Sequence, residues 1–118
     1  MITGGSTTMY QKGDVVLLPF PFTDLTATKT RPAVVVSTEA FQQATGDFTV
    51  AMITSVPRTG TYDVAVQDWQ AAHLLRPSWV RAKLATLDPA LVRYQPGSLS
   101  ARDLTEVEQR IRLALGLT

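Results

Sequence analysis

The prediction of a fold starts from residues 13–37, which read GDVVLLPFPFTDLTATKTRPAVVVS. This stretch opens with a short β-branched run at 14–19 and closes with a second apolar run at 33–37, and both runs are typical of strands. Between them, two prolines end the first strand and small polar residues follow. Loops of this length between short strands are commonly functional, so we expect residues 20–30 to belong to a binding region.

The sequence downstream of this stretch predicts further short strands. The runs at 48–55, 61–67 and 79–87 have the β-branched or alternating pattern of strands. Residues 38–46 have room for one helical turn, and residues 68–76 fit a short helix. The chain is therefore expected to be mainly β.

The C-terminal residues carry the clearest helix signal. Ser100 is a good N-cap, Asp103 occupies the third position of a capping box, and Gly116 is a typical stop. The apolar residues at helical spacing on one face are Leu104, Val107, Ile111 and Leu115. We interpret this face as core, with a dimer contact as the alternative. Short strands with one terminal α-helix predict a small closed barrel or a strongly curved sheet.

The composition restricts the classes of function. The chain has 118 residues, of which 45% are hydrophobic and 18% charged, as is usual for one globular domain. Its formal net charge is +1, so only a local basic patch would hold a nucleic acid. The absence of cysteine excludes disulfides, thiolate zinc sites and a cysteine nucleophile, and it fits a cytoplasmic protein. The one histidine, His73, excludes a paired-histidine nuclease within one chain.

The N-terminus and the hydropathy pattern complete this outline. Residues 1–9 have neither a basic start nor an apolar segment, so we expect a flexible tail, with Met9 as an alternative start. A single domain is then expected over residues 10–118. No run approaches the apolar length of a membrane span, so no membrane partner is expected.

Three side chains near strand ends are candidates for chemistry. Pro32 restricts Arg31 to an extended backbone conformation, so the position from which its side chain projects is well defined. The guanidinium group can donate two hydrogen bonds to one phosphate. The alternative is a surface arginine in an ion pair. Thr54 and Ser55 end a strand on opposite faces, and a hydroxyl there can hold a phosphate oxygen. The alternative for these two is ordinary turn chemistry with their own backbone.

Aromatic and basic residues suggest a binding surface. Phe20 and Phe22 alternate beside the first strand, where aromatic rings can stack single-stranded bases or pack into a core. Arg81 and Lys83 share one strand face. These two, with Lys29, Arg31 and Arg58, form either one basic patch or scattered solvated charge. His73 is expected to cap a helix or lie at the surface.

Taken together, residues 13–37 resemble the MazF/PemK family of toxin endoribonucleases. The resemblance is carried by Gly-Asp, then Phe-Pro-Phe-Thr-Asp, then Arg-Pro before a β-branched strand. Ile53-Thr54-Ser55 is similar to the family's second motif, and residues 78–87 and 97–116 are similar to the rest of its PemK-like branch. The similarity covers residues 10–117.

This resemblance implies an SH3-like small barrel of the MazF/PemK/CcdB type with a C-terminal α-helix, acting as a homodimer. It implies cofactor-free, metal-independent and sequence-specific cleavage of single-stranded RNA through 2′-hydroxyl attack, and neutralisation by a cognate antitoxin. The catalytic arginine falls on Arg31 and the catalytic threonine on Thr54. Because residues 25–30 contain no acid, the general base stays unassigned.

The residues expected to contact RNA are Phe20, Phe22, Thr23, Lys29, Ser55, Arg58, Arg81 and Lys83. Two other functions remain open at this point. One is a same-fold toxin of the CcdB type that poisons gyrase, and the other is a catalytically silent RNA-binding homologue.

Overall fold

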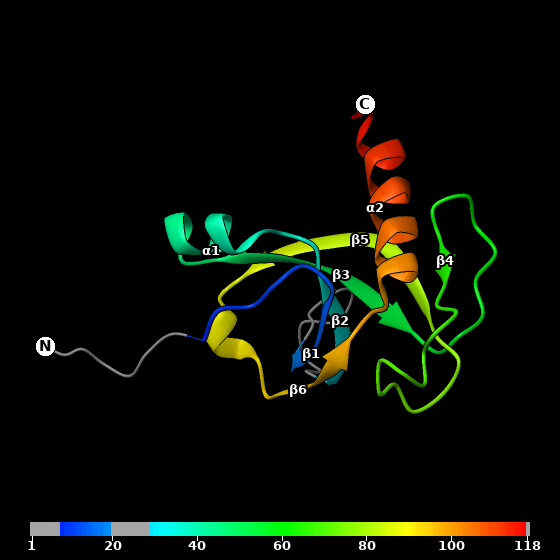
Figure 1. Ribbon diagram of the computed structural model, residues 1–118, viewed down its shortest axis with the longest axis horizontal. Coiled ribbons are helices and arrows are strands. Elements are labelled where there is room, and N and C mark those ends of the chain that lie inside the picture. The colour runs from blue at the N-terminus through cyan, green and yellow to red at the C-terminus, as the bar shows by residue number, and fades with distance from the viewer. Residues whose placement is uncertain (1–7, 20–28, 118) are drawn as a thin grey trace, which may run out of the picture.

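The computed structural model describes residues 8–19 and 29–117, and its central element is one antiparallel sheet. Six strands follow the order β4-β5-β3-β2-β1-β6, curled into a half-barrel (Figure 1). The strands are β1 (Asp14–Pro19), β2 (Thr30–Val35), β3 (Phe48–Thr54), β4 (Val64–Ala65), β5 (Trp79–Leu87) and β6 (Tyr94–Ser98). The helices are α1 (Glu39–Thr45), the 3-10 turn η1 (Pro89–Leu91) and α2 (Ala101–Leu115). The predicted small β barrel with a C-terminal helix is confirmed in this curled form.

The core explains why the strand sequences are continuous apolar runs. Neighbouring residues of one strand enter two different clusters: Val15 packs in the first with Val34 and Ile53, whereas Val16 packs in the second with Phe48. Since side chains alternate across a strand, both faces of the central strands are buried. Curling the sheet lets a chain of this size cover both faces.

Helix α2 covers the first cluster near β4 and β5, at the far side of the molecule from α1 (Figure 1). Val107 is buried, and Leu104 and Ile111 pack beside it. Leu115 was expected on this apolar face, but it is 57% exposed because the last turn extends past the sheet. The Ser100 cap and the Gly116 stop are confirmed, since Ser100 Oγ accepts from the Asp103 amide and Gly116 has a φ of 71°.

Several predicted boundaries differ from the structure. The strand predicted at 33–37 is β2, which begins at Thr30 because it pairs with β1 from Pro19 onward. The strand predicted at 61–67 is reduced to β4, and residues 68–76 form turns instead of a helix. Strand β6 was not expected from the sequence, because its segment YQPGS contains proline and glycine. Proline is tolerated there because β6 lies at the edge of the sheet.

Residues 8–10 are held by α1. The Gln42 side chain donates to the Thr8 carbonyl and accepts from the Tyr10 amide. Tyr10 packs against Phe48, and burial raises the pKa of its phenol, with the Asp14 charge adding to the rise. The rest of the predicted tail, residues 1–7, lies outside the described residues.

Candidate active site

A cavity of about 520 Å³ lies at the end of the sheet where the central strand β2 begins and its neighbour β3 ends. One side is formed by the strands, and the other by the chain between β4 and β5. The residues that line it are Leu17, Thr30, Arg31, Pro32, Ile53, Thr54, Ser55, Val56, His73, Leu74, Leu75, Arg76, Ser78, Tyr94 and Pro96.

Strand pairing places apolar and aromatic lining residues of this cavity next to one another. Leu17 of β1 pairs with Pro32 of β2 on one side and with Tyr94 of β6 on the other. Residues directly opposite each other in adjacent strands project to the same face. The tyrosine ring is 61% exposed, so it offers a flat aromatic surface beside two apolar side chains.

Arg31 and Thr54, the two residues on which the resemblance places catalysis, both line this cavity. The pairing of β2 with β3 runs from Val35–Val50 to Ala33–Met52, so Arg31 and Thr54 each lie two residues beyond its last pair, at the same end of these adjacent strands. Adjacent strands lie about 4.8 Å apart, so these two side chains start from neighbouring positions. The arginine is exposed, and no carboxylate among the described residues forms an ion pair with it.

The two hydroxyl side chains at the end of β3, Thr54 and Ser55, differ in burial. Thr54 is 9% exposed, and its Oγ1 accepts a hydrogen bond from the Val56 amide at 3.1 Å. This is the local turn contact that was the alternative to a functional role. It fixes the oxygen through an acceptor lone pair, so the hydroxyl hydrogen stays available as a donor. Ser55 was expected on the face opposite Thr54, but it is exposed and lines the same cavity, because β3 ends at Thr54 and Ser55 lies beyond the strand.

The opposite wall of the cavity is the turn that carries His73 and Arg76. The Ser78 hydroxyl donates to the Arg76 carbonyl at 2.8 Å, which closes the end of this turn. Arg76 is exposed, and no ion pair is formed by it within the described part of the chain. The cavity therefore presents two guanidinium groups, and no carboxylate is among its described lining residues.

A carboxylate network fixes the start of this wall to α2. Asp103 is 1% exposed, and its oxygens accept from the Gln67 amide at 2.9 Å and the Asp68 amide at 2.8 Å. Asp103 was expected to complete a capping box, but its carboxylate turns to these two amides instead. Hydrogen bonds from Arg102 and then Ser100 lower the pKa of Asp68 from 3.8 to about 2. Residues 67 and 68 are thereby joined to the helix by charged hydrogen bonds.

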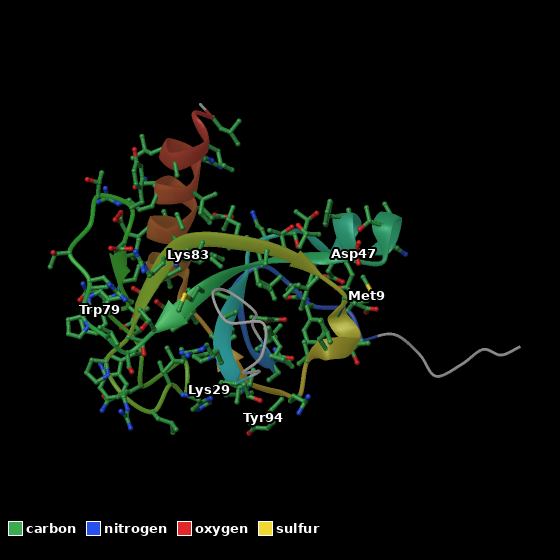
Figure 2. The ribbon with its side chains drawn as sticks, turned by 180° about the vertical axis from the view of Figure 1, so that it is seen from behind. Met9, Lys29, Asp47, Trp79, Lys83 and Tyr94 are labelled. Atoms are coloured by element: carbon green, nitrogen blue, oxygen red, sulfur yellow. The ribbon has the colours of Figure 1, made fainter. Side chains whose placement is uncertain are left out.

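Of the other predicted RNA contacts, those in the described part of the chain do not line this cavity. Phe20, Phe22 and Thr23 lie outside the described residues. Arg81 pairs with Asp63 at 3.3 Å and faces α2, and Arg58 is exposed away from the described lining. Figure 2 shows Lys29 toward the same edge as Tyr94, and Lys83 on β5. The predicted basic patch is therefore not formed around the cavity. Its five members were to be Lys29, Arg31, Arg58, Arg81 and Lys83.

Three lining residues with titratable side chains were not expected there. Arg76 and Tyr94 were not singled out in the sequence, and His73 was expected at a helix end or at the surface. Their segments carry no periodic signal: β6 contains proline and glycine, and the turn before Pro77 has mixed composition. An arginine followed by proline, as at Arg31-Pro32, was the one cue that could have drawn attention to Arg76-Pro77.

Two features are absent from the described part of the chain. In residues 8–19 and 29–117, no group of three or more histidine, cysteine, aspartate or glutamate side chains is arranged to hold a metal ion. No helix in the same part of the chain has the length and apolar character needed to cross a bilayer.

The fold and the cavity define a small curled-sheet protein with a cationic cavity suited to an anionic group. The chain belongs to the family of PemK-like, MazF-like toxins of type II toxin–antitoxin systems, whose model matches residues 11–115. No sequence among curated proteins matches it significantly.

Solved structures agree with this assignment. A mycobacterial endoribonuclease in complex with its cognate antitoxin superposes with a TM-score of 0.78 at 21% identity, covering 92% of this chain and 97% of that one. MazF in a MazE–MazF complex from Deinococcus radiodurans superposes with a TM-score of 0.75 at 27% identity, covering 94% and 100%. The Mycobacterium tuberculosis toxin MazF-mt6 gives 0.73 at 23% identity, covering 89% and 98%.

Proposed function

We propose that this protein is a toxin endoribonuclease that cuts single-stranded RNA at short sequences, without a metal ion. The observation that carries the proposal is the common cavity of Arg31 and Thr54, reached from separate strands. Family membership and the endoribonuclease named among similar structures support the same activity. A cavity with two guanidinium groups suits a polyanionic backbone.

The proposed chemistry uses the substrate's own nucleophile. The 2′-hydroxyl oxygen attacks the adjacent phosphorus, and the bond from phosphorus to the 5′-oxygen breaks. Arg31 stabilises the charge that grows on the phosphoryl oxygens, and Thr54 donates its hydroxyl hydrogen to one of them. The products are a 2′,3′-cyclic phosphate and a 5′-hydroxyl end. DNA resists because it lacks the 2′-oxygen.

The rest of the cavity suits nucleotides on either side of the cut. The exposed ring of Tyr94 offers a stacking surface for a base, and Arg76 offers a second phosphate contact. Ser55 contributes one more hydroxyl beside Thr54. Which bases are preferred would follow from the shape of this lining.

The proposal extends to partners and place of action. A cognate antitoxin is expected, since the Deinococcus radiodurans MazF is seen with MazE. An extended, partly acidic antitoxin segment in the cavity would compete with RNA for the same cations. The protein would act as a homodimer, as the resemblance implies. Its proposed substrate, messenger RNA, sets the cytoplasm as the place of action.

The decisive experiment maps the ends of RNA fragments made by the purified protein in EDTA. We expect cuts at one recurring short sequence, with cyclic phosphate ends, and no cut where a single 2′-deoxy nucleotide precedes the scissile phosphate. Arg31→Ala should lower the cleavage rate by about 10²–10³-fold, the cost of losing one charge-stabilising donor group. Arg112→Ala, on the exposed end of α2, is the matched control and should cut normally.

RNA left intact by the wild-type protein across many sequences would refute the ribonuclease proposal. If Arg31→Ala stayed toxic in cells without cutting RNA, a protein target of the CcdB type would be favoured instead. If the wild-type protein bound RNA with salt-dependent affinity but never cut it, the silent homologue would be favoured.

A further inference from the structure

We propose that His73 is the general base of the reaction, taking the proton of the attacking 2′-hydroxyl through its Nε2 atom. This inference rests on the proposed function and assigns the one role that the sequence left open. It depends on three features of the cavity wall: the hydrogen bond of the other ring nitrogen, the fixed backbone of the turn, and the chemistry of the remaining lining residues.

The ring is oriented by a hydrogen bond to β6. His73 Nδ1 lies 2.8 Å from the carbonyl oxygen of Pro96. A carbonyl oxygen can only accept, so Nδ1 must carry the hydrogen. In the neutral ring this leaves the Nε2 lone pair free to accept a proton. Among the described residues, no partner occupies Nε2.

The backbone holds the ring in this position. His73 has a φ of 61°, the one left-handed residue other than glycine in the described chain. The turn rests on Gly97 of β6, where a Cβ would lie 2.7 Å from the Ala72 carbonyl oxygen and 2.9 Å from His73 Nδ1. Only a glycine at this position lets the turn approach the strand. An unusual conformation held by such close packing is a frequent feature of functional sites.

The remaining lining residues leave His73 as the group suited to accept a proton. The charged or titratable side chains that share the described lining with it are Arg31, Arg76 and Tyr94. Guanidinium groups have no acceptor lone pair in water, and a phenol holds its proton at neutral pH. The threonine and serine hydroxyls are weaker bases still. Histidine is the side chain best matched to proton transfer near pH 7.

The proposed step balances without a co-reactant. Nε2 takes the 2′-hydroxyl proton as the 2′-oxygen bonds to phosphorus. The bond to the 5′-oxygen breaks, and that oxygen takes a proton from solvent water. The hydroxide left behind removes the proton from the imidazolium, which restores the base.

The test compares His73→Asn with wild-type in single-turnover cleavage of an RNA oligonucleotide that carries the mapped cut site. Asparagine tolerates positive φ, and its amide can donate to the Pro96 carbonyl in place of Nδ1, but it has no basic nitrogen. We expect the cleavage rate to fall by about 10²–10⁴-fold, the usual contribution of a general base. Affinity for the same oligonucleotide with a 2′-deoxy nucleotide at the cut should not change.

Two further arms separate a base from an acid and from a structural role. Replacing the 5′-oxygen at the cut by sulfur removes the need to protonate the leaving group, so the rate loss of His73→Asn should persist on this substrate. Gln70→Ala, an exposed change in the same turn, is the matched control and should cut at the wild-type rate. Should His73→Asn melt below the assay temperature, His73→Gly, which suits the same φ, provides the comparison.

A His73→Asn rate equal to wild-type would overturn the inference and leave the proposed ribonuclease intact. A rate loss that disappears on the sulfur substrate would overturn it too, because His73 would then be the proton donor. RNA left uncut by wild-type would refute the proposed function, and this inference with it.

Discussion

The buried carboxylate of Asp103 should be a major source of stability, because it joins α2 to the chain that leads into the cavity wall. Its oxygens accept from the amides of Gln67 and Asp68 at 2.9 and 2.8 Å, with the residue 1% exposed. Asp103→Ala leaves both amides without their acceptor. Hydrogen bonds to a charged group are worth about 1.5–3 kcal/mol each, so we expect a loss of about 3–6 kcal/mol.

That loss is large for a chain of this size. Domains are stable by about 5–15 kcal/mol in total, so Asp103→Ala removes a sizeable part of the folding free energy. At roughly 3–5 °C per kcal/mol for a domain of this length, the melting temperature should fall by about 10–30 °C. The measurement is thermal and urea unfolding followed by circular dichroism at pH 7.

Two further variants define the comparison. Asp103→Asn keeps one carbonyl oxygen to accept one amide and should lie between wild-type and Asp103→Ala. Glu106→Ala, exposed on the same helix, should melt like wild-type. A loss below about 1 kcal/mol for Asp103→Ala would refute the reasoning, because it would mean that water replaces the carboxylate at both amides.

Two more predictions concern pH and RNA binding. The pKa of Asp68 is lowered from 3.8 to about 2 by Arg102 and Ser100, so its charge stabilises the fold above pH 3.8 and this contribution is lost as the pH falls toward 2. Asp68→Asn should therefore melt below wild-type at pH 7, with the gap closing at about pH 2; a gap that is constant with pH would contradict this origin. Tyr94→Ala should weaken RNA binding by about 5–150-fold in a fluorescence titration, the loss of one stacked base at about 1–3 kcal/mol. Tyr94→Phe keeps the aromatic face and should bind normally, whereas an equal loss in both variants would argue against stacking.

Elements with strong local signals were predictable from sequence. The strand at 79–87 and the helix between Ser100 and Gly116 match the structure because alternation, capping and left-handed stops depend on neighbouring residues. Strand β6 was missed because its existence depends on pairing with β1, not on its own composition. Asp103 shows the same limit: its position next to a cap is local, but its partners are 35 and 36 residues away.

The candidate site also combines features that depend on local sequence with features that depend on tertiary contacts. Local sequence made Arg31, Thr54 and Ser55 candidates, because a proline-restricted arginine and strand-end hydroxyls can be recognised from neighbouring residues. The resemblance to the toxin family then placed the catalytic roles on Arg31 and Thr54. Only the tertiary structure brought them into one cavity and added His73, Arg76 and Tyr94 to its lining. The physical reason is that strand pairing and the packing of a turn on β6 are contacts between distant segments, and no local pattern encodes which distant segments meet.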